Sequence, residues 1–352
     1  ALYILKSANC WSCKPLEDNE KKIASQLTLN YKSNETENKF RFDINKYFQG
    51  WKLSYGASTQ FEEYTNNTFN VLRRELKDST GAIIQPAITI NFKSPLKNFW
   101  KFGAFAQLSK RFLDNRLGFS AGIRSDMNTI TTDGNNPLKT LSPRIGLSYS
   151  IAEKITWNIS VGRYYKIPTY TMLGFADANN VLVNKSAKYL QADHYVTGFE
   201  YLPNEALRFT VEGFYKQYTN VPVSVRNGIA LSNLGNDFTV LGNEAVSTNG
   251  KGRAYGVEFF AQKKLTKKFF GIISYTFYKS EYSGANGKYI SSSWDNKHLL
   301  SLTAGYKLPR NFEIGLKFRF QGGAPYTSYD EIASQLNYLT LGQGVLDYSK
   351  LN

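Results

Sequence analysis

The chain has 352 residues, of which 42% are hydrophobic and 15% aromatic, and its formal net charge is +15. This apolar and aromatic content argues against a disordered chain, and no run approaches the roughly 18 apolar residues that a membrane-spanning helix needs. Lys and Arg are spread along the chain without a dense cluster or a recognisable nucleic-acid-binding module, so we expect no nucleic-acid partner.

The N-terminal part holds the only two cysteines, Cys10 and Cys13, in the stretch CWSC. A metal or redox pair is one interpretation, but no second CxxC motif and no nearby histidine completes a metal site. A local disulfide or two free thiols in a turn is the favoured alternative, and we expect no metal and no cofactor. The start, ALYILKSANC, lacks an initiator Met and a signal-peptide pattern, which predicts a mature protein or an internal fragment.

Alternation of apolar and polar residues recurs along the chain with a period of two, which predicts β-strands. Two of these segments, Trp51 to Tyr64 and Phe269 to Tyr282, are long enough to cross a bilayer as tilted strands. The stretch FEIGLKFRFQ at 312–321 has only apolar residues on one face and charged or small residues on the other. The same pattern occurs in KITWNISVGRYY at 154–165, LRFTVEGFYK at 207–216 and LLSLTAGYKL at 299–308.

Short and long connections between these segments alternate. The short turns are expected near residues 45–50, 111–115, 151–154, 202–206, 264–267 and 308–311, and the long polar segments at 65–98, 127–143, 167–192, 219–251, 283–294 and from 326 onward. Outer-membrane barrels have short periplasmic turns and longer extracellular loops, whereas a soluble sandwich has no reason to sort its loops by length.

The fold class predicted is therefore all-β, a transmembrane antiparallel β-barrel. The pattern predicts about thirteen strands, with residues 2–6 as a possible extra strand, although single-chain bacterial barrels have even strand numbers. In such a barrel the apolar faces meet lipid and the charged faces meet a wet lumen.

Alternation also assigns individual side chains to a side of the barrel wall. Five charged residues are predicted to face the lumen and form charge ladders or contact a plug: Arg208, Glu212, Glu258, Lys317 and Arg319. Aromatic residues near strand ends suit the girdles at the two membrane interfaces. We expect Tyr164, Tyr165, Tyr215, Tyr218, Tyr275 and Tyr278 to lie there.

Several hairpins resemble the barrel of TonB-dependent outer-membrane receptors, particularly the Bacteroidetes type. The similar stretches include FGAFAQLSKRFLDNRLGFSAGIRSD (102–126), LSPRIGLSYSIAEKITWNISVGRYYKIPT (141–169) and GKGRAYGVEFFAQKKLTKKFFGIISYTF (250–277). ADHYVTGFEYLPNEALRFTVEGFYKQYTNVP (192–222) and WDNKHLLSLTAGYKLPRNFEIGLKFRFQGGAPYT (294–327) extend the resemblance in the same order.

The resemblance implies an active transporter of the cell outer membrane, with about 22 strands and an N-terminal plug. It implies uptake of a scarce small-molecule or oligomeric nutrient, such as a ferric siderophore, energised by the TonB complex, with membrane lipid and lipopolysaccharide as neighbours. No plug or coupling box precedes Ala1, and the chain stops at LDYSKLN. We therefore expect residues 1–352 to be an incomplete barrel region.

Ligand contacts are expected in the long connections, where basic and aromatic residues would suit an anionic ligand. The candidates are Lys166, Tyr170, Asn179, Asn180, Lys185, Arg226 and Asn233. The alternative for each is an ordinary solvated loop face or a lipopolysaccharide contact.

Other functions have some support. A passive porin would share the barrel pattern, and a surface adhesin would bind without uptake. His194 follows Asp193, and His298 lies near Asp295, so a barrel hydrolase is a further alternative, although no nucleophile motif accompanies either pair. Hydrogen-bonded interface histidines are the commoner explanation, and no catalytic residue is predicted.

Overall fold

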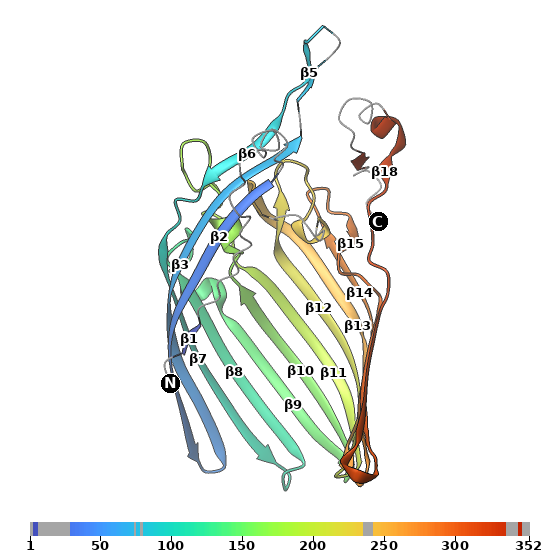
Figure 1. The fold of residues 1–352 in the computed structure, drawn as a ribbon. Helices are drawn as coiled ribbons and strands as arrows, with labels where there is room; N and C mark the ends of the chain where they lie inside the picture. Colours follow the sequence, from blue (N-terminus) through green and yellow to red (C-terminus); the bar gives the residue numbers. More distant parts are fainter. Residues whose placement is uncertain are drawn as a thin grey trace.

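The computed structural model describes residues 3–5, 29–73, 75–77, 80–234, 242–335 and 344–346, and Cys10 and Cys13 lie outside this part. The chain forms one large, strongly curved antiparallel sheet whose strands are tilted and joined in chain order (Figure 1). None of the described helices is both long enough and apolar enough to cross a membrane.

The main sheet has 15 strands, and all except β6 and β15 follow one another in the order of the chain. Its strands are β1 (Tyr3–Leu5), β2 (Leu29–Phe48), β3 (Trp51–Arg73), β6 (Ile88–Lys93), β7 (Asn98–Phe112), β8 (Leu117–Asn128), β9 (Ser142–Ala152), β10 (Ile155–Lys166), β11 (Leu190–Asn204), β12 (Leu207–Ser224), β13 (Val246–Thr266), β14 (Phe269–Ser283), β15 (Tyr289–Ser291), β16 (His298–Lys307) and β17 (Glu313–Gln321). Outside the sheet lie β4 (Leu76–Lys77), β5 (Ile83–Gln85), β18 (Tyr329–Asp330), β19 (Val345–Leu346), the helix α2 (Tyr170–Leu173) and the 3₁₀ turns η2 (Pro137–Thr140), η3 (Leu231–Asn233) and η4 (Pro309–Asn311).

Thirteen strands of the main sheet follow one another in chain order, in agreement with the prediction of about thirteen. The alternation of short and long connections is also confirmed. All the tight hairpin turns lie at one end of the sheet and the longer connections lie at the other (Figure 1). The prediction that residue 65 begins a loop is wrong, since β3 continues to Arg73 and pairs there with β6. Polar residues occupy both faces of this extension, so the alternation disappears while the hydrogen-bonded ladder continues.

The two faces of the sheet differ as the alternation predicts. At Phe312 and along β17 to Phe320 the apolar side chains are 49–67% exposed on the outer face, while Lys317 and Arg319 pair with the inward-facing Thr303 and Ser301. We call the outward-facing apolar positions the apolar band. Towards the long connections it ends at Ile145 on β9, Val161 on β10, Tyr195 on β11 and Tyr215 on β12, and on β2 it ends at Phe40.

The predicted aromatic girdle is only partly present on the outer face. Tyr215 and Tyr275 face outward with the apolar band. Tyr164, Tyr218 and Tyr278 share the parity of the inner face, so their assignment to the girdle is wrong. The reason is geometric, because residues an odd number of positions apart on a strand point to opposite faces.

The connection between β10 and β11 packs over the inner wall near its long-connection end. Leu173 of α2 is fully buried in a cluster with Tyr64 of β3 and Phe99 of β7. The Asn184 side chain donates hydrogen bonds to the carbonyl oxygens of Met172 (2.8 Å) and Glu244 (2.9 Å), which ties this connection to the one before β13. The segment 167–192, which the sequence predicts as a long polar loop, is therefore packed against the inner wall.

Candidate functional site

A cavity of about 320 Å³ lies against the inner wall where five strands meet this packed connection. Its walls come from β2, β3, β7, β8 and the end of β10, and Tyr189 closes one side. The charged residues that line it are Lys39, Arg41, Lys101, Arg124, Lys166 and Asp126. Five cations and one carboxylate make this a basic pocket, and we use that name below.

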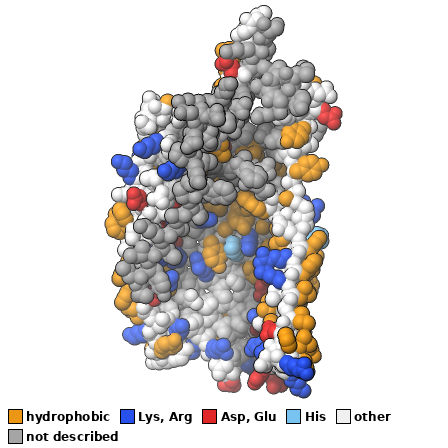
Figure 2. Space-filling view, viewed as in Figure 1, with side chains coloured by type: hydrophobic (Ala, Val, Ile, Leu, Met, Phe, Trp, Pro, Cys, Tyr) orange, Lys and Arg blue, Asp and Glu red, His pale blue; other side chains and the backbone are white. Residues whose placement is uncertain are grey.

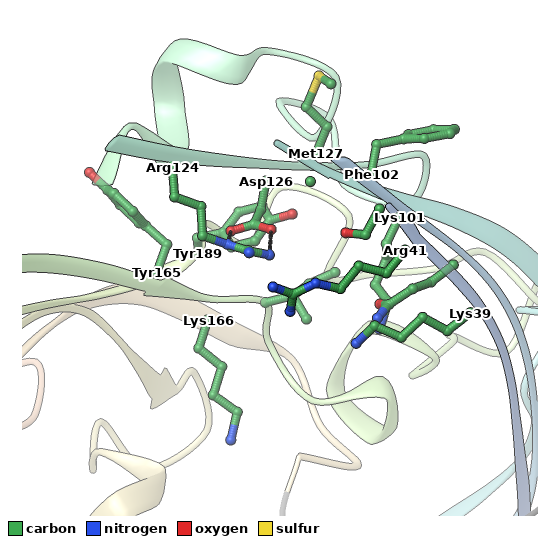
Figure 3. Close-up of a pocket in the computed structure, with 14 residues that line it drawn as sticks. Lys39, Arg41, Lys101, Phe102, Arg124, Asp126, Met127, Tyr165, Lys166 and Tyr189 are labelled. Atoms are coloured by element: carbon green, nitrogen blue, oxygen red, sulfur yellow. Dashed lines mark hydrogen bonds and ion pairs between the residues drawn. The ribbon is translucent and has the colours of Figure 1, made fainter. Parts of the chain in front are cut away.

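Arg124 and Asp126 form an ion pair across the floor of the basic pocket, with an Nε–Oδ2 distance of 2.8 Å and a second contact through Nη2 (Figure 3). The glycine at position 103 makes room for this pair. A Cβ atom there would lie 2.7 Å from Asp126 Oδ1 and 2.9 Å from Arg124 Nη2. The small residue therefore lets the pair lie flat against β7.

The remaining cations differ in how far they are neutralised. Arg41 binds Asp43 at 2.6 Å and points toward the Arg124–Asp126 pair from the opposite side of the pocket (Figure 3). Lys39 and Lys166 have no ion-pair partner among the described residues. Two uncompensated charges in a concave, partly enclosed space favour the binding of an anion.

Lys101 links the basic pocket to a buried carboxylate. Its Nζ lies 2.5 Å from Glu62 Oε1 and donates a hydrogen bond to the Tyr170 hydroxyl at 2.6 Å. Glu62 is completely buried, and Glu37 of β2 lies directly opposite it in the ladder. Burial and the charge of Glu62 raise the pKa of Glu35, which lies on β2 beyond the apolar band. Burial, followed by the same charge, raises the pKa of Tyr170.

The structure brings only part of the predicted ligand set together. Lys166 lines the basic pocket, and Tyr170 contacts it through Lys101. Asn179 and Asn180 lie in the turn that follows Asp177, whose carboxylate accepts a hydrogen bond from the Asn179 backbone. Lys185 is exposed and lies in the same connection. Their role in ligand binding stays a prediction.

The other two candidates are held by structural contacts in a different connection. Arg226 lies 3.6 Å from Glu244 in an ion pair. Asn233 donates hydrogen bonds to the carbonyl oxygens of Ile290 and Ser291. Neither residue lines the basic pocket.

The two histidines lie at the long-connection ends of their strands, but on opposite faces. His298 faces outward and its Nδ1 is 2.9 Å from the Tyr275 hydroxyl, whereas His194 faces inward. Asp193 is bound by Arg163 and Gln191, and Asp295 accepts a hydrogen bond from the Ser280 backbone. Neither neighbouring Asp is therefore engaged with its histidine, which removes the geometric basis of the hydrolase alternative.

Most residues of the basic pocket were not among the predicted ligand contacts, because the candidates were chosen from the long connections and not from the strands. Lys39, Arg41 and Lys101 lie within strands, on the inward parity. A signal is present in the sequence, since each is next to at least one outward-facing aromatic residue, as in KFRF at 39–42 and WKF at 100–102. The predicted inward orientation of Arg208, Glu212 and Glu258 is confirmed, and Arg208 forms the expected ladder contact with Glu200.

Comparison with solved structures shows the same fold at low sequence identity. The ferripyoverdine receptor of the outer membrane of Pseudomonas aeruginosa superposes with a TM-score of 0.57 at 15% identity, covering 86% of this chain and 40% of that one. The ferric-catecholate import receptor Fiu of Escherichia coli gives a TM-score of 0.57 at 15% identity, covering 86% and 46%. The copper transporter OprC gives 0.56 at 15% identity, covering 83% and 43%. The chain thus spans less than half the length of each.

Comparison of the sequence with family models identifies the family of this chain, whereas comparison with individual curated proteins does not. No curated protein gives a significant match. The family model described as TonB dependent receptor-like, beta-barrel matches residues 16–349. That match covers nearly the whole chain. The chain therefore belongs to the family of TonB-dependent-receptor-like β-barrels.

Proposed function

We propose that this chain forms part of the barrel wall of an outer-membrane transport receptor that takes up an anionic solute. The leading candidate for this solute is a ferric siderophore. The observation that carries the proposal is the basic pocket, in which Lys39 and Lys166 are uncompensated cations on the inner wall. Two of the similar solved proteins are named for ferripyoverdine and ferric catecholate. The copper transporter of the same fold shows that the fold alone does not select iron.

Energy for uptake would come from the TonB complex, in keeping with family membership. The hairpin resemblance described above supports a receptor of the Bacteroidetes type. The outward-facing apolar band suits a location in the outer membrane, with lipid and lipopolysaccharide around it. No covalent chemistry is needed for this function, so the proposal includes no catalytic residue.

Binding is tested with two synthetic ferric chelates, an anionic tris-catecholate and an uncharged tris-hydroxamate, followed by tryptophan fluorescence of the purified receptor. The variant K39M/K166M should bind the catecholate at least about tenfold more weakly, since about 1.4 kcal/mol of lost attraction changes affinity tenfold. Binding of the uncharged chelate should change little. The control K317M removes an inward-facing cation of β17 that does not line the pocket.

Equal catecholate affinity in K39M/K166M and K317M would show that the basic pocket does not select the ligand. Uptake of radioactive iron by cells distinguishes a receptor from a porin. Active transport stops when a protonophore collapses the proton gradient, whereas passage through a porin continues. Binding with no uptake under either condition would instead support the adhesin alternative.

A further inference from the structure

A second group of basic residues lies on the inner wall, nearer the tight turns than the basic pocket. Arg144 of β9, His194 of β11 and Lys216 of β12 all have inward parity. Gly162 of β10 pairs with both Arg144 and His194, and it lies four residues before the pocket residue Lys166. That separation corresponds to about 13 Å along the strand.

Tyr164 contacts two of these residues, Arg144 and His194. The Arg144 guanidinium lies 4.2 Å from the centre of the Tyr164 ring, and the Tyr164 and His194 rings are 4.5 Å apart. The glycine at 162 provides the space for this stack. A Cβ atom there would lie 3.1 Å from both Arg144 Cγ and the Tyr164 hydroxyl oxygen. The geometry of the group is therefore fixed by the strands rather than by a flexible loop.

Carboxylates are absent from this group among the described residues. Arg144 and Lys216 make cation–π contacts with Tyr164 and Phe214 but have no ion-pair partner there. The nearest carboxylate, Asp193, has outward parity and is bound by Arg163 at 2.6 Å. This contrasts with Arg208, which pairs with Glu200 on the same inner wall.

We propose that Arg144, His194 and Lys216 form a second anion-binding site on the inner wall, and that His194 gains a proton when a sulfate-like, phosphate or carboxylate anion binds there. An anion between Arg144 and Lys216 offsets their repulsion of an imidazolium and can accept a hydrogen bond from it. The site would hold an anionic solute after it leaves the basic pocket. Only this transport role rests on the proposed function; anion binding itself does not.

The charges around His194 support a linked protonation. His194 lies beyond Tyr195, outside the apolar band. Burial, then Lys216 from β12 and Arg144 from β9, lower the pKa of His194, while Asp193 on its own strand opposes this. Without an anion the imidazole is therefore held neutral near neutral pH. Binding and protonation then favour each other, so anion affinity rises as the pH falls.

NMR titration of the two histidines tests this directly, because the chain has only His194 and His298. The ring Cε1 signals of the ¹³C-labelled protein in detergent micelles are followed between about pH 5 and 8, the range in which histidine titrates and sulfate keeps its charge. Sodium sulfate is compared with sodium chloride at equal ionic strength, and H194Q assigns the signal. Saturating sulfate should raise the pKa of His194 by about one, which is equivalent to tenfold tighter binding to the protonated form.

His298 serves as the internal control, since it faces outward beside Tyr275. Its Cε1 signal should be the same in both salts at each pH. In K216M and R144M the response of His194 to sulfate should be lost, while K317M should retain it. An unchanged His194 in sulfate, an equal response of both histidines, or a response that persists in both K216M and R144M would each overturn the site. None of these outcomes depends on chelate uptake, so this proposal and the proposed function can fail separately.

Discussion

Replacing Lys101 with Met should destabilise the sheet by about 3 kcal/mol, because it leaves the Glu62 carboxylate buried without its counter-ion. Glu62 is 0% exposed and Lys101 only 20%, so solvent screens the 2.5 Å contact weakly. Breaking one side of a buried ion pair typically costs about 3–5 kcal/mol. The lower end applies here because Met retains much of the apolar stem that Lys101 packs near the Tyr170 ring.

A double-mutant cycle separates the ion pair from the packing of the two side chains. The variants K101M, E62Q and K101M/E62Q are unfolded with urea in lipid vesicles and followed by tryptophan fluorescence. The double variant should be more stable than K101M, since it removes the uncompensated charge, and the coupling free energy should exceed about 1 kcal/mol. Additive effects of the two substitutions, or a K101M variant within about 0.5 kcal/mol of the parent, would refute the reasoning.

Two further changes probe the floor of the basic pocket and the rim of the apolar band. G103A should push the Arg124–Asp126 pair into the pocket and weaken binding of the catecholate several-fold. Because the close atoms are side-chain ends, it should lower the free energy of unfolding by only about 1 kcal/mol; an unchanged affinity would contradict the role given to Gly103. At Asp193, burial alone would raise the pKa, but hydrogen bonds from Arg163 and Gln191 lower it overall. Its contribution is therefore present above the ordinary value of 3.8 and is lost as the pH falls through the lower folded value. D193N should cost about 0.5 kcal/mol at pH 7, since Arg163 is 43% exposed, and the difference from the parent should vanish in acid; a pH-independent difference would show that the ion pair is not its source.

Alternation along the strands predicted the sheet and its sidedness because one face meets an apolar surrounding and the other meets water. The signal is lost where that contrast ends. Residues 65–73 and 219–224 lie beyond the apolar band, so their strands continue without an alternating pattern. Alternation along one strand also conflicts with a girdle containing both Tyr164 and Tyr165, which are adjacent and point to opposite faces.

The basic pocket could be predicted only in part, because parity gives the face of a residue but not its neighbours across the lumen. The stretch KFRF occurs at 39–42 and again at 317–320, and both copies point Lys and Arg inward. The first lines the pocket, whereas the second lies on β17 outside it. The two copies differ in their surroundings, which are set by the curvature of the sheet and by the packed connection after β10. Neither feature can be predicted from the local sequence pattern.

The distribution of charge pairs on the two faces gives the net charge of +15 a structural meaning. At the outer rim of the apolar band, Arg163 is paired with Asp193 and Arg253 with Glu281, and Lys279 also binds Glu281. On the inner wall Lys39, Lys166, Arg144 and Lys216 have no carboxylate partner among the described residues. A charge beside an apolar phase is poorly solvated and is stabilised by pairing, whereas cations on the inner wall are tolerated in water (Figure 2 shows Lys and Arg side chains across the hollow of the sheet). The unpaired cations on the inner wall create a positive potential where field lines are focused by low-dielectric surroundings. The excess of positive charge at these positions underlies both proposals, in which anions are attracted to the basic pocket and to the site around His194.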